Sequence, residues 1–159
     1  MALSSKEVEK KIAELLTQIQ ALKEVVYPTD LRPIVKRKRD EFLTLCKKNG
    51  VPVRVTSQVR SWAEQDKLYA QGRTTSGKIV TNAKGGESMH NHGLAFDVCF
   101  DSITPWIGDW DKVGKLGESI GLEWGGRWAS FVDRPHFQYL AGYTEKDIRT
   151  GKHDFDKFT

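Results

Sequence analysis

The sequence contains little cysteine and no long apolar stretch. Its two cysteines, Cys46 and Cys99, lie far apart and form no CxxC pair, which excludes a disulfide framework and a thiolate zinc knuckle. No run approaches the roughly eighteen consecutive apolar residues of a membrane-spanning helix. The first residues, MALSSKEVEKK, lack the apolar segment of a secretory signal, so we expect a soluble cytoplasmic protein unless another factor releases it.

Positive charge is concentrated in one part of the chain. The sequence has 25 Lys and Arg against 21 Asp and Glu, a net charge of +4. Residues 1–50 hold 11 basic and 7 acidic side chains, whereas residues 51–159 are balanced. The densest basic run is Lys36, Arg37, Lys38 and Arg39. It favours a solvated helix face, and the alternative is weak attraction to an anionic wall polymer, a lipid surface or nucleic acid.

Two helices are predicted in the first third of the chain. Ser4 and Glu7 form a capping box at the start of an amphipathic helix over residues 4–26. Its apolar positions recur at steps of three and four residues: Val8, Ile12, Leu15, Leu16, Ile19, Leu22 and Val26. A second helix is predicted over about 33–48, with Thr29 or Asp30 before it and Asn49-Gly50 as its end.

The rest of the chain mixes short strands with helices. Alternating valines predict a strand over 51–56, and further strands are expected over 94–100 and 135–140. A helix with a Ser61/Glu64 capping box is expected to end at Gly72, and another is expected over 109–120. Residues 73–87 form a long polar loop of the kind that borders binding clefts. The pattern indicates an α+β fold with a small sheet, preceded by two helices, with residues 1–28 as a helical extension and residues 29–159 as the main domain.

Three of the four histidines fall in two short segments. His90 and His92 lie in Ser88–Asp97, and His136 ends the segment Asp133-Arg-Pro-His136. A catalytic zinc takes three protein ligands, with neutral imidazole and carboxylate among the accepted donors. His90, Asp97 and His136 would supply such a set. Spacing alone is also consistent with a second interpretation, in which these side chains bind no metal and serve only as hydrogen-bonding groups.

The wider pattern resembles the peptidase family M15 metallopeptidases. The matching residues are Ser88-x-His90-x-x-Gly93-x-Ala95-x-Asp97 followed by Asp133-x-x-His136, and upstream the run from Gln58 to Thr74 is similar to the L-alanyl-D-glutamate endopeptidase branch. The resemblance covers about residues 50–140. It departs at Gln58-Val59, where relatives commonly have Gly-Tyr before the arginine. It implies a hedgehog or D-Ala-D-Ala peptidase-like fold, with a small antiparallel sheet and flanking helices.

The resemblance also implies roles for individual residues. His90, Asp97 and His136 would bind one Zn²⁺ per chain, and Asp133 would act as general base and then as acid. Arg60 is our candidate for the cation that stabilises the developing oxyanion. Ser88, Gln65 and Trp124 are the candidate substrate-binding residues, although turn, helix-surface and core roles remain open for them. We expect His92 to line the cleft or pack, and we assign Trp62, Trp106 and Trp110 to packing.

The expected function is zinc-dependent hydrolysis of the peptidoglycan stem peptide between L-Ala and D-Glu. One alternative is a D-alanyl-D-alanine carboxypeptidase, and another is a zinc-bearing wall-binding module without turnover. The absence of a signal favours a phage or prophage endolysin that stays in the cytoplasm until host lysis, when a separate membrane-permeabilising protein releases it to act on the wall from the periplasm or from outside. The alternative is a bacterial wall-remodelling enzyme. Lys36–Arg39 would assist adsorption to an anionic wall or membrane, and no specific nucleic acid is expected as a partner.

Overall fold

The computed structural model describes residues 4–26 and 28–159, with side chains described outside residues 19–26 and 155. The predicted apolar positions Ile19, Leu22 and Val26 therefore lie outside the described side chains. The helices and strands occur in the order α1 (Ser5–Val26), α2 (Pro33–Lys48), β1 (Val53–Ser57), α3 (Trp62–Ala70), β2 (Ala95–Phe100), α4 (Trp110–Ser119), β3 (Glu123–Trp124), β4 (His136–Gln138) and α5 (Glu145–Arg149). Short 3₁₀ turns add η1 (Met89–His92), η2 (Gly125–Arg127) and η3 (Phe155–Phe158). Among the described residues, no helix is both long and apolar enough to cross a bilayer.

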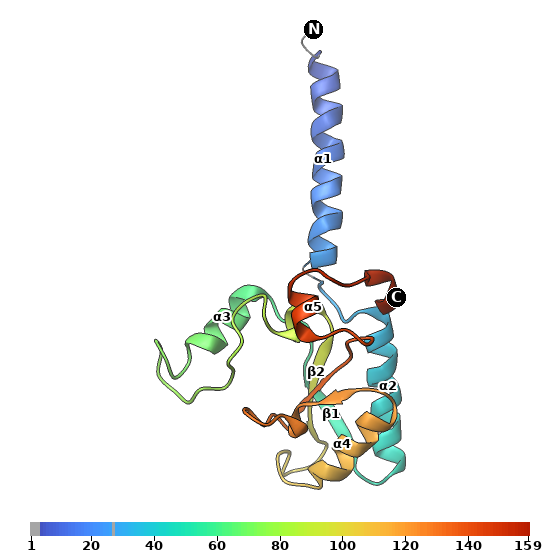
Figure 1. Ribbon diagram of the computed structural model, residues 1–159, viewed down its shortest axis with the longest axis vertical. Helices are drawn as coiled ribbons and strands as arrows, with labels where there is room; N and C mark the ends of the chain where they lie inside the picture. The colour runs from blue at the N-terminus through green and yellow to red at the C-terminus, as the bar shows by residue number, and fades with distance from the viewer. Residues whose placement is uncertain (1–3, 27) are drawn as a thin grey trace.

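The four strands form one antiparallel sheet in the order β1-β2-β4-β3. This confirms the predicted α+β class and the small antiparallel sheet. The short strand β3, which follows the turn after α4, was not predicted, because two residues are too few to show an alternating pattern. Figure 1 shows α2 and α4 on one side of the strands, with α3 and its loop on the other and α1 extending away from the body.

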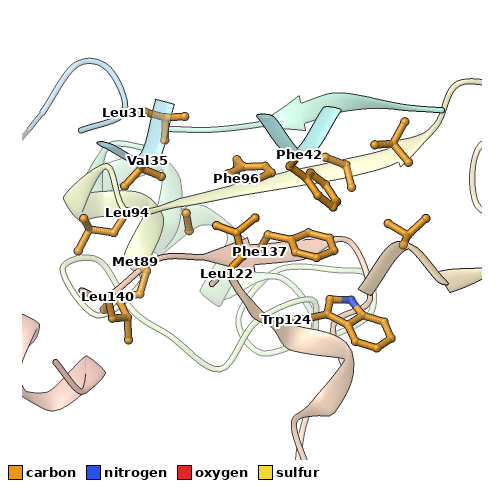
Figure 2. Close-up of a cluster of buried hydrophobic side chains, with 14 of the residues drawn as sticks. Leu31, Val35, Phe42, Met89, Leu94, Phe96, Leu122, Trp124, Phe137 and Leu140 are labelled. Carbon is orange, nitrogen blue, oxygen red and sulfur yellow. The ribbon is translucent and has the colours of Figure 1, made fainter. Parts of the chain in front are cut away.

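Aromatic rings join the sheet to the helices on its inner face. Phe42 of α2 lies 4.5 Å from the ring of Phe137 in β4 and 5.9 Å from Phe96 in β2. Figure 2 shows these rings together, with Trp124 below them. Gly117 of α4 is also in this cluster, because a Cβ placed on it would lie 2.6 Å from Phe137. The strands next to the site are therefore anchored by a fully packed core.

Helix α2 begins at Pro33 and ends at Lys48, as predicted. Its N-cap residue is Arg32, which makes no side-chain cap. Pro33 occupies the first turn, where its missing N–H needs no partner, so a capping side chain is less necessary. Arg32 donates from its backbone N–H to the carbonyl of Gly93 at 2.9 Å and from Nε to the carbonyl of His92 at 3.2 Å. The helix start is thereby tied to η1, which carries His90.

The other predicted boundaries agree closely with the structure. Ser4 and Glu7 cap α1, and Ser61 and Glu64 form a full capping box on α3. Asn49 is the C-cap of α2. These features are local in sequence, which is why they could be predicted from it.

The basic run of α2 contacts acceptors on its own chain. Lys36 pairs with Asp30 at 2.7 Å, and Arg37 donates to the carbonyl of Thr159 at 2.9 Å. Lys38 donates to the carbonyl of Ile120 at 2.6 Å, and Arg39 donates to the side chains of Asp40 and Gln58. These contacts tie the helix to its surroundings, so most of the run has a structural role.

Candidate metal centre and active site

Sheet register brings two of the predicted ligands together. In the antiparallel pair of β2 and β4, Phe96 lies opposite Phe137 and Asp97 lies opposite His136. Successive side chains of a strand point to opposite faces. The Phe pair therefore enters the core, and the Asp97–His136 pair faces the other way. On the far side of β2, an irregularity in β1 places Ser57 opposite Asp97 as well.

His90 approaches the same point from η1. The Ser88 hydroxyl accepts a hydrogen bond from the His90 backbone N–H at 3.4 Å and so caps this turn. Gly93 ends the turn with φ of +69°, a conformation that favours glycine. The Nδ1 atom of His90 contacts the backbone carbonyl of Gln58, which assigns the proton to Nδ1. The Nε2 atom of His90 is therefore unprotonated and can bind a metal.

His136 is oriented by a second amide. Its Nε2 lies 3.0 Å from Oε1 of Gln138, a residue that is 1% exposed. Nε2 of Gln138 donates to the carboxylates of Glu123 and Glu145, each at 3.1 Å. Because both amide hydrogens meet carboxylates, Oε1 must face the ring, and His136 carries its proton on Nε2. Nδ1 of His136 is then free to bind a metal.

The three ligand atoms form a nearly equilateral triangle. Nε2 of His90 lies 3.1 Å from Oδ1 of Asp97 and 3.2 Å from Nδ1 of His136, and the third edge is 3.2 Å. Zinc bonds of about 2.0–2.1 Å at tetrahedral angles separate ligand atoms by about 3.3 Å. The residues present therefore fit a tetrahedral zinc ion with a fourth position open. Within the described residues, these three are the only His, Cys, Asp and Glu group brought together in this way.

The electrostatics of the triangle suit a cation. Burial opposes ionisation of Asp97, but the His90 and His136 rings hold the pKa of Asp97 well below its ordinary value. Burial likewise opposes protonation of His136, yet the hydrogen bond and charge of Asp97 raise the pKa of His136 above its usual range. A proton on His136 therefore occupies the place that a metal would take.

Asp133 is held beside the ligands by backbone contacts. Its N–H donates to the carbonyl of Gly125 at 3.0 Å, and its own carbonyl accepts from the N–H of His136 at 3.2 Å. A Cβ on Gly125 would lie 2.5 Å from the Asp133 carbonyl oxygen, so only glycine allows this approach. Burial raises the pKa of Asp133, against the opposing effect of His136. A raised pKa is what a carboxylate needs to accept and later release a proton near neutral pH.

Arg60 lies beside Asp97, close to its second carboxylate oxygen. One guanidinium nitrogen is 3.5 Å from Oδ2 of Asp97 and donates to the Ser57 hydroxyl at 3.0 Å, while the other donates to Oε1 of Gln65 at 2.7 Å. Gln65 is 0% exposed, and its Nε2 donates to the carbonyl of Ala83 at 2.8 Å. The structure therefore corrects the expectation of a substrate contact at Gln65. It lies behind Arg60 and holds it in place.

A cleft of about 870 Å³ opens over the triangle. It is bordered by the three candidate ligands together with Arg60, Ser88, Asp133, Trp106 and Trp128. Trp128 has its ring centre 5.0 Å from that of His136. Trp106 is 58% exposed and borders the cleft. The expectation that Trp106 is a packing residue was therefore wrong.

Trp124 is the second correction among the predicted substrate-binding residues. It is 3% exposed, its ring stacks with Phe137 at 6.5 Å, and its Nε1 donates to the carbonyl of Arg134 at 2.8 Å. Figure 2 shows it within the core. The bend at Gly125-Gly126 sends Trp124 inward, while Trp128, which follows η2, reaches the cleft.

Two other predicted placements can be compared with the structure. His92 is 9% exposed, its Nε2 lies 3.0 Å from the carbonyl of Gly86, and burial lowers its pKa, as expected for a packing residue. Trp110 packs on Phe100 with ring centres 4.7 Å apart. Sequence reasoning missed Gln138, Glu123 and Glu145. The only available signal was that Gln138 lies two positions after His136, on the same face of its strand.

Comparison with known proteins agrees with this geometry. A family model described as D-alanyl-D-alanine carboxypeptidase, of the peptidase M15 group, matches residues 81–139. The chain is 40% identical over 133 residues to the peptidoglycan L-alanyl-D-glutamate endopeptidase CwlK of Bacillus subtilis (strain 168), covering 76% of this chain and 80% of that protein. The chain belongs to peptidase family M15. The M15 resemblance in the sequence is therefore confirmed.

The chain is also similar to a phage peptidase and to an endopeptidase of known structure. The chain is 31% identical over 107 residues to the L-alanyl-D-glutamate peptidase of Listeria phage A118, covering 62% of this chain and 34% of that protein. The crystal structure of the Serratia marcescens L-Ala D-Glu endopeptidase ChiX matches with a TM-score of 0.50 and 25% identity, over 69% of this chain and 80% of that chain. The fold is also similar to that of the vancomycin resistance D,D-pentapeptidase VanY, with a TM-score of 0.55 and 14% identity over 80% of this chain and 83% of that chain, which confirms the D-Ala-D-Ala peptidase-like fold.

Proposed function

We propose that this M15 chain is a zinc-dependent peptidoglycan peptidase that hydrolyses the stem peptide between L-Ala and D-Glu. The observation that carries the proposal is the ligand triangle of His90, Asp97 and His136, which matches tetrahedral zinc and opens onto one cleft with Asp133 and Arg60. The printed activity of the relative that shares 40% identity supports this choice of bond.

The proposed chemistry divides between the metal and the side chains around it. A zinc ion held by the triangle would supply Lewis acidity and a lower pKa for attacking water. Asp133 accepts the proton of that water and delivers it to the nitrogen of the leaving amine. Burial raises the pKa of Asp133, which favours both halves of this transfer near neutral pH.

Arg60 would stabilise the negative charge that develops on the carbonyl oxygen. Its guanidinium is fixed by Gln65 and Ser57 and stands close to Asp97, so no reorganisation is needed as the charge forms. Ser88 and Trp128 border the cleft and are the proposed substrate contacts. Ser88 is partly committed to capping η1, whereas Trp128 offers an apolar wall beside His136.

A D-alanyl-D-alanine carboxypeptidase is the second candidate. The description of the matching family model favours it. A carboxypeptidase needs a cation for the terminal carboxylate of its substrate. Arg149 borders the cleft, but its guanidinium already contacts the Glu145 carboxylate at 2.7 Å and the Glu87 carbonyl at 2.8 Å. This compensation of its charge makes the endopeptidase the better-supported function.

The test is mass spectrometry of purified meso-diaminopimelate peptidoglycan after incubation with zinc-loaded protein. New D-Glu amino termini are expected, and they should disappear on chelation and in Asp133→Ala, which should keep its zinc. Asp111→Ala, an exposed acid on α4, is the matched control and should keep full activity. Release of D-Ala alone would establish the second candidate. Bound zinc with no product on this or a second wall type would indicate a binding module.

The place of action is part of the proposal. Similarity to the phage peptidase supports an endolysin that stays in the cytoplasm and acts on the wall once a separate protein has permeabilised the membrane. Weak anionic contact through Lys36–Arg39 is proposed only for the exposed parts of this run, because each side chain also contacts its own chain. Neutralising Lys36 and Arg37 without any change in lysis at low salt would argue against that contact.

A further inference from the structure

The helix α1 carries an apolar face that the described part of the chain leaves exposed. Val8 is 41% exposed, Ile12 51%, Leu15 46% and Leu16 61%. Figure 1 shows α1 extending away from the domain that holds the cleft. A single helix of this length is marginal in water, and amphipathic helices obtain most of their stability by packing the apolar face. The face therefore needs a partner outside its own domain.

The spacing of the apolar residues indicates what that partner is. Val8, Ile12 and Leu15 are separated by steps of four and three, and the sequence continues the alternation through Ile19, Leu22 and Val26. This is a strict heptad pattern, with Ile12, Ile19 and Val26 at a positions and Val8, Leu15 and Leu22 at d positions. β-branched residues at a combined with leucine at d favour parallel two-stranded coiled coils.

The charges of α1 distinguish a second helix from a lipid surface. A helix that lies on a membrane carries a strongly basic polar face and aromatic residues on its apolar face. Residues 5–18 contain three lysines and three glutamates and no aromatic residue. Lys11 and Glu14 pair with each other at 3.6 Å along the helix. A balanced polar face gives no attraction to anionic lipid and no repulsion between two copies.

We propose that α1 pairs with α1 of a second copy of this chain in a parallel two-stranded coiled coil. Residues 1–28 then form a dimerisation extension, and the pairing itself does not depend on the proposed function. If that function holds, parallel pairing places two clefts at the same end of one rod. Two clefts on one wall polymer would raise the effective concentration of the second after the first has bound.

The mass of the full chain in solution tests the pairing. Sedimentation velocity at tens of micromolar is expected to give twice the chain mass of 18.0 kDa. Leu15→Lys places a charge at a d position and should give monomers. Thr17→Lys makes the same charge change at an exposed position on the opposite face and should remain dimeric. A monomeric parent chain, or an unchanged mass for Leu15→Lys, would overturn the proposal.

Crosslinking tests the parallel orientation. Val8 occupies a d position near one end of α1. In the parallel arrangement, Val8→Cys brings two thiols together and should form a disulfide-linked dimer under mild oxidation, whereas in an antiparallel pair these thiols would lie at opposite ends. Lys10→Cys, on the opposite face, should not crosslink. Cys46 and Cys99 are buried and do not interfere. Failure of Val8→Cys to crosslink in a dimeric protein would refute the parallel assignment. Flotation with anionic vesicles that is lost in Leu15→Lys, from a protein that is monomeric without lipid, would identify a lipid surface instead.

Discussion

Gln138 offers the sharpest test of how the candidate metal centre is held. We predict that Gln138→Met weakens zinc binding while the domain stays folded. Methionine has a similar volume but cannot accept the hydrogen bond from Nε2 of His136, which spans 3.0 Å in the structure. The ring would lose both its orientation and the group that selects its Nε2–H tautomer. Loss of such a partner typically costs about 10–100-fold in metal affinity, or about 1.4–2.7 kcal/mol.

We expect Gln138→Met to lower the free energy of unfolding by less than this loss in zinc-binding free energy. The two carboxylates that lose their amide partner in this variant are not deeply buried. Glu123 is exposed, and the Glu145 side chain is 36% exposed, so water can replace the amide at both. Zinc affinity is measured by competition with a chromophoric chelator, and thermal unfolding of the metal-free protein reports on the fold. Glu123→Gln, which leaves the contact with His136 in place, is the matched control. An affinity for Gln138→Met within about twofold of the parent would refute the role assigned to this amide.

Three further predictions follow from the same structure. Zinc affinity should fall as pH is lowered, and the fall should begin above the ordinary imidazole range, because the pKa of His136 is raised and its proton must leave before metal binds. Zinc affinity is measured by chelator competition across a pH series. The absence of this trend would contradict the assignment of His136 as a ligand. Burial raises the pKa of Cys46 to about 12 from 9.0, so the thiol of the folded protein should resist alkylation at pH 8. Because the thiol of the unfolded chain ionises at lower pH, the free energy of unfolding should fall as pH rises from about 9 towards 12. Rapid labelling of Cys46 in the native protein would contradict this prediction. Arg60→Gln should lower kcat by about 10²–10³-fold while zinc content is unchanged, and loss of zinc in this variant would instead mark Arg60 as a support for Asp97.

Some features of the structure depend on residues that are close in sequence, and others depend on residues that are far apart in the chain. The capping boxes at Ser4 and Ser61 and the helix end at Asn49 involve neighbours within a few positions, so the sequence is sufficient to predict them. The ligand motif is also readable, because its spacing is typical of the family. The bounds of α2 were also predicted correctly, whereas the hydrogen bond of its N-cap residue Arg32 to η1 was not predicted, because it joins residues far apart in the chain.

The amino-acid sequence alone determined the family, the α+β class and the choice of the three candidate metal ligands, which the structure brings together. Tertiary structure decided which side chains reach the cleft. Gln65 is buried behind Arg60, Trp124 enters the core while Trp128 borders the site, and Gln138 orients His136 through two glutamates. These outcomes depend on sheet register and on contacts between residues far apart in the chain. Periodicity and composition report which face of a strand or helix a residue occupies, but they do not report what lies across from it.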